Sequence, residues 1–300
     1  MHRAFALPAL AACSFQGPLT TDAAALHDGA PVIDGHVTTC LEKWQQHTVQ
    51  LGPELPLTTI NTSTTDRDVF VTLDETQLYL SHANPDPDIV VATRAITTTT
   101  FGAPTLTTIS SPDNEGKLSL TGDGMFAAIS ALELPASQFN VVLYQRSSVT
   151  DFTRKGVIAV AATSDHNDYD PYITPDGLRL YWAPVTVGLN DQVITLASRP
   201  DLATTFSVDR VLTELGSPAS DPAPSYDETV LLYSKQTDGG SIQYATRATA
   251  SGPFTPVGPV PTINTAGNEA DPHLSKDACH VYFARFSPTT DWDLYVAPVL

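Results

Sequence analysis

A short segment that returns five times constrains the fold of this chain more than any other feature. Its clearest copy runs from Asp170 to Trp182 and reads Asp-Pro-Tyr-Ile-Thr-Pro-Asp-Gly-Leu-Arg-Leu-Tyr-Trp. Every copy has Ser or Thr two residues before an Asp, and an apolar triplet four to six residues after that Asp. The copies begin at Asp68, Lys117, Asp170, Asp221 and Asp271, in steps of 49, 53, 51 and 50 residues. A period near 50 residues with strand-like units predicts a β-propeller.

Each repeat unit predicts one four-stranded blade. The first strand follows the leading residue, the turn is built on Asp-Gly or an equivalent pair, and the apolar triplet forms a buried second strand. The third strand ends in Arg in four of the five units, and a Phe follows about seven residues later. We expect these Phe side chains to pack between adjacent blades as structural residues. They are Phe101, Phe152, Phe206 and Phe254.

The fifth unit stops at Leu300, directly after its third strand, so its outer strand must come from elsewhere in the chain. Residues 51–61 closely echo residues 257–264, and each segment ends in an Asn seven positions before a leading Asp. Residues 44–60 should therefore supply the missing strand. We predict an all-β fold, a five-bladed β-propeller over residues 44–300 that an N-terminal outer strand closes in the last blade. Closure removes exposed sheet edges.

The residues before the propeller differ in character. Residues 1–13 resemble a bacterial export signal, because a basic start and an apolar run lead into Leu-Ala-Ala-Cys, which looks like a lipobox ending at Cys13. Lipidation of Cys13 would anchor the protein peripherally to a membrane, in the periplasm or at the cell surface. Alternatively, the match arises by chance, since the apolar run is short for a signal. Residues 14–43 lack a hydrophobic period and predict a flexible tether.

Cys40 and Cys279 are the two other cysteines of the chain. Closure of the ring brings both into the last blade, where an exported protein could hold them as a disulfide. The alternative is two unpaired thiols, because a disulfide needs Cα atoms within about 7 Å.

The charge balance limits the partners. Thirty-three acidic and 15 basic residues give a formal charge of −18, which repels nucleic acids and anionic lipid surfaces. We expect a monomer that contacts a membrane only through its anchor, with a neutral, cationic or metal-bridged partner such as an envelope protein or a glycan. The charge is also explained by solubility alone.

The repeat resembles the WD-like propeller repeat of TolB-type periplasmic proteins. The similarity rests on Asp-Pro-x-x-Ser/Thr-x-Asp-Gly-x-x-Leu-Tyr-Trp and on Asp-Leu-Tyr-Val-Ala at 293–297, and it covers about residues 44–300. It implies binding of a protein or another ligand in the periplasm or at the cell surface. Two features depart from the family pattern: Lys117 and Leu118 replace Asp-Pro in the second unit, and such repeats commonly form six or seven blades.

The leading residues of the five units form the candidate ligand-binding site. Innermost strands line the axis of a propeller, so these side chains should project toward one mouth of the channel; they are Asp68, Lys117, Asp170, Asp221 and Asp271. Four carboxylates that one lysine partly balances would repel one another, which leaves room for a hard cation such as calcium or magnesium. The alternative is structural, with each Asp accepting backbone hydrogen bonds at the start of its blade.

Other polar residues give weaker signals. The acidic loop Asp165-His-Asn-Asp168 matches no metal motif and predicts a solvated turn. His273 and His280 lie on strands, where a single histidine is usually structural. The sequence has no Gly-x-Ser-x-Gly, phosphate-binding loop or Cys-x-x-Cys, so it offers no obvious nucleophile, nucleotide or zinc signature.

Two function classes remain. The first is an exported binding or scaffold propeller without catalytic residues. The second is a glycoside hydrolase that uses axial Asp carboxylates as acid and as base or nucleophile. Against the enzyme, the similar sequence contexts of these residues predict similar pKa values, whereas the mechanism needs them to differ. A lectin-like ring with one sugar site per blade is a third class, which the aberrant second unit disfavours.

Overall fold

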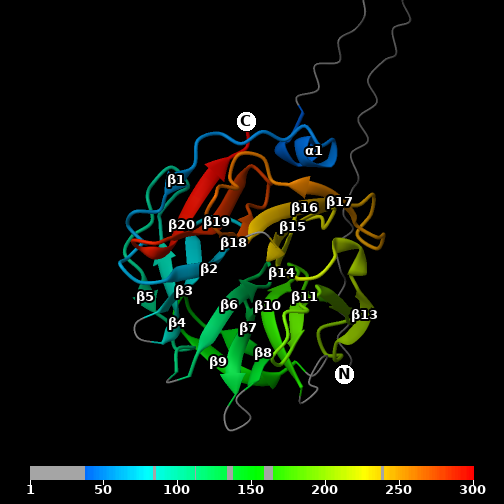
Figure 1. The fold of residues 1–300 in the computed structure, drawn as a ribbon. Coiled ribbons are helices and arrows are strands. Elements are labelled where there is room, and N and C mark those ends of the chain that lie inside the picture. Colours follow the sequence, from blue (N-terminus) through cyan, green and yellow to red (C-terminus); the bar gives the residue numbers. More distant parts are fainter. Residues whose placement is uncertain (1–37, 84–85, 112, 134–137, 159–164, 238–239) are drawn as a thin grey trace, which may run out of the picture. The chain divides into compact units, whose positions relative to one another are not determined.

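The computed structural model describes residues 38–300 except 84–85, 112, 134–137, 159–164 and 238–239. Within this region the strands form five four-stranded sheets, which Figure 1 shows arranged around a common centre. Each innermost strand contacts the innermost strand of the next sheet, and the last contacts the first. The predicted all-β, five-bladed propeller is confirmed.

Each blade is antiparallel, and its strands run outward from the axis in chain order, except that β1 is the outermost strand of blade 5. Blade 1 holds β2 (Asp66–Val71), β3 (Gln77–Ala83), β4 (Pro87–Thr93) and β5 (Thr105–Leu106). Blade 2 holds β6 (Glu115–Leu120), β7 (Phe126–Glu133), β8 (Gln138–Arg146) and β9 (Phe152–Val157). Blade 3 holds β10 (His166–Ile173), β11 (Arg179–Thr186), β12 (Thr195–Ser198) and β13 (Ser207–Val211). Blade 4 holds β14 (Ala219–Pro224), β15 (Val230–Lys235), β16 (Ser241–Thr246) and β17 (Thr255–Pro259). Blade 5 holds β18 (Glu269–Leu274), β19 (His280–Ser287), β20 (Asp291–Pro298) and β1 (Leu55–Pro56).

The repeated Ser/Thr-x-Asp pattern forms the turn between the first two strands of each blade. In blade 3 the Thr174 hydroxyl donates to Asp176 Oδ1 at 2.6 Å, and the backbone N–H of Leu178 donates to the same oxygen at 2.9 Å. Gly177 follows with φ of 71°, a conformation that glycine adopts without steric cost. The same pattern recurs in the other blades because each needs the same tight reversal.

The ring closes through the strand that the sequence predicts. β1 pairs antiparallel with β20, with Leu55 opposite Val296, as Figure 1 shows near the C-terminus. A second contact joins Leu51 to Val299. Cys40 and Cys279 form a disulfide with their Cα atoms 5.1 Å apart, so the pairing that the sequence left open is present.

A short helix begins the described chain. α1 spans Cys40–Gln45 and starts with a capping box between Thr39 and Glu42, which satisfies backbone N–H groups at the helix start. It lies partly within the predicted tether, so the folded unit begins before residue 44. Residues 1–37, with the predicted signal and Cys13, lie outside the described residues. None of the described helices is long and apolar enough to cross a membrane.

Three of the four arginines at the ends of the third strands cover phenylalanines predicted to pack between blades, whereas Arg146 lies over Tyr79. Arg94, Arg199 and Arg247 place their guanidinium carbons 4.3, 4.4 and 4.1 Å from the ring centres of Phe101, Phe206 and Phe254, respectively. Their Nε–H groups donate to the turn carbonyls of Glu75, Gly177 and Glu228. Blade 5 has no such arginine, and there Trp44 of α1 donates its indole N–H to the corresponding carbonyl of Ala278 at 3.1 Å.

Candidate functional site at the propeller axis

A break in each innermost strand turns the leading residues toward the axis. In all five blades the register shifts across the leading residue, for example between Arg67 and Phe70 in β2. The four leading aspartates adopt left-handed backbone conformations with φ between 53° and 60°. Such β-bulges redirect side chains and are common next to functional sites. Asp tolerates the conformation better than most residues.

The structure brings the five predicted site residues together. One carboxylate oxygen from each of Asp68, Asp170 and Asp271 lies within 4.8 Å of the others. Asp170 Oδ2 also accepts the backbone N–H of Asp221 at 3.4 Å. That is the one backbone bond to a leading aspartate among the described hydrogen bonds, so backbone capping does not account for the whole set. Ligand binding by these residues stays a prediction.

Arg67 belongs to the cluster, although it is not one of the residues predicted from the repeat. Its Nε and Nη2 donate to the two carboxylate oxygens of Asp271 at 3.0 and 3.3 Å, and its Nε lies 3.6 Å from Asp68 Oδ1. A two-pronged arginine–carboxylate contact is both strong and geometrically specific. The only signal in the sequence is a basic residue directly before a leading Asp, a position that is uncharged in the other units.

The carboxyl groups of the cluster differ in acidity. Burial and the charge of Asp271 raise the pKa of Asp68 to about 7. Burial and the charge of Asp221 raise the pKa of Asp170 well above its usual range. Burial also acts on Asp271, but Arg67 and Lys117 outweigh it and hold the pKa of that carboxyl below its usual range. The expectation of similar pKa values was wrong, because a single arginine makes one of the four contexts different.

Lys117 lies fully buried among these carboxyls. Its positive charge acts to lower the pKa of each leading aspartate, although burial outweighs it at Asp68, Asp170 and Asp221. Its Nζ has no hydrogen-bond partner among the described residues. Asp68, Asp170 and Asp271 have oxygens spaced to share one hard cation. Lys117 already supplies positive charge at that place, so the donor set suits a cation only in part.

Three rings close the axis on one side of the cluster. Phe70, Tyr172 and His273 are buried two residues after their leading aspartates. The Phe70 and His273 ring centres lie 4.8 Å apart, and Tyr172 lies 6.4 Å from both. His273 Nε2 contacts the carbonyl of Val71 at 3.0 Å, and burial together with Lys117 lowers its pKa to about 3. His273 is therefore a neutral structural residue, and the channel is blind.

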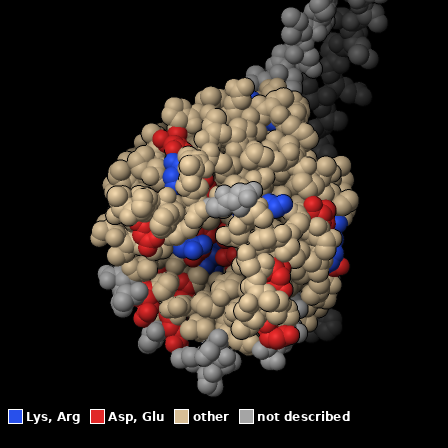
Figure 2. All heavy atoms as spheres, in the orientation of Figure 1, with Lys and Arg blue, Asp and Glu red and all other residues tan. Residues whose placement is uncertain are grey.

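A cavity of about 210 Å³ opens beside the axis between blades 1, 2 and 3. Figure 2 shows a hollow near the middle of the ring, with basic and acidic side chains next to each other. The residues that give the cavity its chemistry are Arg67, Asp68, Glu115, Phe139, Tyr169 and Asp170. Two predicted site residues thus reach the cavity, whereas Asp271 and Lys117 lie behind them, fully buried.

A second set of buried acids lies two residues before the leading position. Asp66, Glu115 and Glu269 each accept bonds from the backbone and hydroxyl of a Ser or Thr four residues earlier. In blade 3 the corresponding Asp168 accepts the indole N–H of Trp182 at 3.0 Å, and burial raises its pKa to about 6. The prediction of a solvated turn is wrong for Asp168, which is buried in β10.

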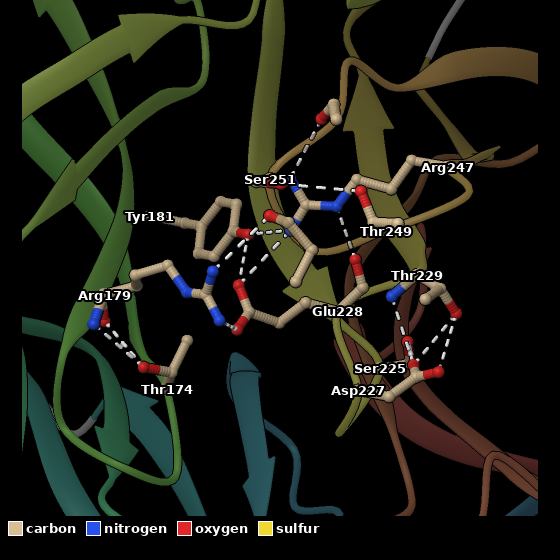
Figure 3. A network of polar contacts seen from close by, with 12 residues as sticks. Thr174, Arg179, Tyr181, Ser225, Asp227, Glu228, Thr229, Arg247, Thr249 and Ser251 are labelled. Atoms are coloured by element: carbon tan, nitrogen blue, oxygen red, sulfur yellow. Dashed lines mark hydrogen bonds and ion pairs between the residues drawn. The ribbon is translucent and has the colours of Figure 1, made fainter.

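Polar networks join neighbouring blades away from the axis. Figure 3 shows Glu228 of blade 4 between Arg179, Tyr181 and Arg247. The Tyr181 hydroxyl donates to Glu228 Oε2 at 2.6 Å, Arg179 pairs with Glu228 Oε1 at 2.5 Å, and Arg247 donates to the Tyr181 oxygen at 2.7 Å. Glu228 and its blade 1 counterpart Glu75 both have positive φ, 59° and 54°. These residues hold the ring together and lie outside the axial cluster.

Comparisons with known proteins support the fold. No family model matches the chain, and no curated protein matches it. The chain is similar in structure to a family 117 glycoside hydrolase from Zobellia galactanivorans, with 12% identity, a TM-score of 0.56, and coverage of 83% of this chain and 90% of that one. It is also similar to TolB from Acinetobacter baumannii, with 14% identity, a TM-score of 0.47, and coverage of 78% and 54%, respectively.

These similarities concern the β-propeller architecture. TolB proteins are among the matched structures, as the repeat pattern suggested, and the glycoside hydrolase shares the fold over most of both chains. A similarity at 12% sequence identity shows the fold and no further property.

Proposed function

We propose that this protein is an exported binding module that takes a small ligand at the axial mouth of its propeller. The observation that carries the proposal is a blind cavity whose inner wall holds the carboxylates of Asp68 and Asp170 beside the guanidinium of Arg67. Buried charged groups with perturbed acidity in a concave site are typical of ligand-binding positions. The four left-handed aspartates add backbone strain at the same place.

The disulfide supports export. Disulfides persist in oxidising compartments such as the periplasm and are rare in the cytosol, and Cys40 and Cys279 pair in this fold. Together with the lipobox-like sequence at Cys13, this pairing favours a protein at the cell envelope, held by a lipid anchor. A Cys13→Ala variant should move from the membrane fraction to the soluble fraction; an unchanged distribution would refute the anchor.

Binding at the mouth is tested by thermal unfolding of the full chain with three probes of different chemistry: calcium chloride, putrescine and galactose. A ligand that binds only the folded state raises Tm with concentration. At least one probe should raise Tm in the wild type and fail to do so in the Asp68→Asn/Asp170→Asn double variant. Failure of all three probes to raise Tm, or an equal shift in the variant, would overturn the proposal.

Glycoside hydrolysis is the second candidate function, and one observation favours it. The mechanism needs a protonated and an ionised carboxyl, and the pKa of Asp170 is raised whereas that of Asp271 is lowered. Two observations oppose it: Asp271 is fully buried and bound by Arg67, and the carboxylate oxygens lie within 4.8 Å, below the separations of about 5 to 9.5 Å that glycosidases use. Release of nitrophenol from aryl glycosides, abolished by Asp170→Asn, would establish the enzyme.

A further inference from the structure

We propose that the ligand of the axial cavity is a neutral, ring-shaped molecule carrying several hydroxyl groups, such as a monosaccharide or a cyclitol. This inference rests on the proposed binding function and names the chemical class of the ligand. It follows from the hydrogen-bonding needs of the cluster, from its charge, and from two aromatic rings in the cavity wall.

The first argument is the unmet hydrogen bond of Lys117. Its side chain is fully buried and its Nζ has no partner among the described residues, which is costly for a charged donor. The nearby carboxylates are acceptors, and burial together with the charges of Asp271 and Asp221, respectively, raises the pKa values of Asp68 and Asp170. The cluster is therefore short of an oxygen that accepts from Lys117 and donates to a carboxylate.

A hydroxyl group or a water can both accept a hydrogen bond from Lys117 and donate one to a carboxylate. A hydroxyl has one donor hydrogen and two acceptor lone pairs, whereas an ammonium group only donates and a carboxylate only accepts. A metal ion could bind the carboxylates, but its positive charge would be repelled by those of Lys117 and Arg67. Lys117 does not line the cavity, so a ligand hydroxyl would reach it through one buried water and complete the cluster without changing its charge.

The second argument is the wall of the cavity. Phe139 and Tyr169 both line it, with ring centres 4.9 Å apart and planes inclined by 41°. Both side chains are half-buried, so part of each ring remains available to a ligand. An apolar ring face beside a strip of donors and acceptors suits a saturated ring with C–H groups on its face and hydroxyls on its rim. Arg67 and Asp68 stand at the polar end.

Isothermal titration of the full chain with galactose, glucose and myo-inositol tests the class, with calcium chloride, putrescine and sodium acetate as comparison probes. At least one hydroxylated probe should bind saturably, and the comparison probes should not displace it. Tyr169→Leu and Asp170→Asn should each weaken that binding by about tenfold, as expected for losing one good contact. Tyr226→Leu and Asp209→Asn change exposed residues outside the cavity and should leave it unchanged.

Lys117→Met should abolish binding; should that variant not fold, the Asp170→Asn result decides. The proposal is overturned if no hydroxylated probe binds, if both cavity variants bind it as the wild type does, or if calcium or putrescine displaces it. Saturable binding of calcium or putrescine that Asp170→Asn removes would overturn the ligand class but leave the axial binding function standing.

Discussion

Two blade junctions share one design and differ in one charged residue. Between blades 3 and 4, Glu228 accepts from Tyr181 and pairs with Arg179 and Arg247. Between blades 5 and 1, Glu75 accepts from Tyr282 at 2.7 Å and pairs with Arg94, but His280 lies where Arg179 would be, 3.3 Å from Glu75. An arginine stays charged at all ordinary pH values, whereas a histidine titrates.

The difference falls at the junction where the ring closes. Only that junction joins two distant parts of the chain, and the turn that carries His280 also carries the disulfide from Cys279 to Cys40 and receives the indole bond of Trp44. The interior junction relies on charge pairing, while the closing junction adds a covalent link. We therefore expect the two to fail under different conditions.

Removal of the disulfide should have the largest effect. It links residues 239 positions apart, so its loss frees the unfolded chain and should lower the free energy of unfolding by about 2–5 kcal/mol. Urea unfolding of Cys40→Ser/Cys279→Ser measures this loss. An unchanged urea midpoint would show that strand pairing alone closes the ring.

Replacing the arginine that pairs with the glutamate at each junction, Arg247 or Arg94, should lower stability by different amounts. The Arg247 side chain is fully buried, whereas that of Arg94 is 11% exposed. Arg247→Met should cost about 3 kcal/mol, because it leaves a buried carboxylate short of a partner. Arg94→Met should cost less, since the Arg94 side chain is partly exposed and water can reach the carboxylate that it leaves. Equal losses in urea unfolding would contradict the distinction.

Removal of the indole donor should weaken the packing of blade 5 against blade 4, where Trp44 lies. Trp44 is fully buried, and its N–H takes the place of the arginine Nε at the carbonyl of Ala278. Trp44→Phe keeps the aromatic packing against Tyr244 but leaves that carbonyl without its donor, at a cost of about 1–3 kcal/mol. The matched Phe254→Leu change at the interior junction serves as control. If the Tm of Trp44→Phe equals that of the wild type, the Trp44 N–H does not replace the arginine donor of the other blades.

The smallest effect should be a pH dependence. The Glu75 carboxylate, 3.3 Å from His280 Nδ1, raises the pKa of His280 against the effect of burial. The stability that this contact adds is therefore complete below the unfolded histidine pKa of about 6.5 and is lost as pH rises through the folded pKa. Burial raises the pKa of Glu75, but His280 and Tyr282 outweigh burial and lower the pKa overall. The stability that Glu75 adds is therefore lost as pH falls through its folded pKa. Asp277 and Arg94 also act on His280, in opposite directions.

His280→Arg copies the interior junction and should flatten the dependence of Tm on pH between 6 and 8.5. The side chain is 38% exposed, so solvent screening keeps the change below about 1 kcal/mol. Parallel Tm curves for the variant and the wild type would show that His280 does not titrate against Glu75.

The repeat made the architecture predictable, because every unit needs the same Ser/Thr-x-Asp turn and buried triplet. The incomplete fifth unit predicted the closing strand for the same reason. α1 was missed, since six helical residues leave almost no periodic signal and are held by the cap at Thr39 and the disulfide.

The axial cluster was predictable only in outline. Position in the repeat identified its four aspartates and Lys117, but not the side chains around them. Arg67 appears once and therefore has no repeat signal, although its charge does the most to lower the pKa of Asp271 against the effect of burial. The ring of Phe70, Tyr172 and His273 closes the axis through contacts between blades, which the pattern within a unit does not encode.

The layer of three tilted rings next to the carboxylates makes the two faces of the propeller unequal. Any molecule that reaches Asp170 must enter and depart through the same opening, so traffic through the ring from one face to the other is ruled out. The residence time of a bound molecule then depends on the side chains that line this one passage, among them Arg67 and Tyr169.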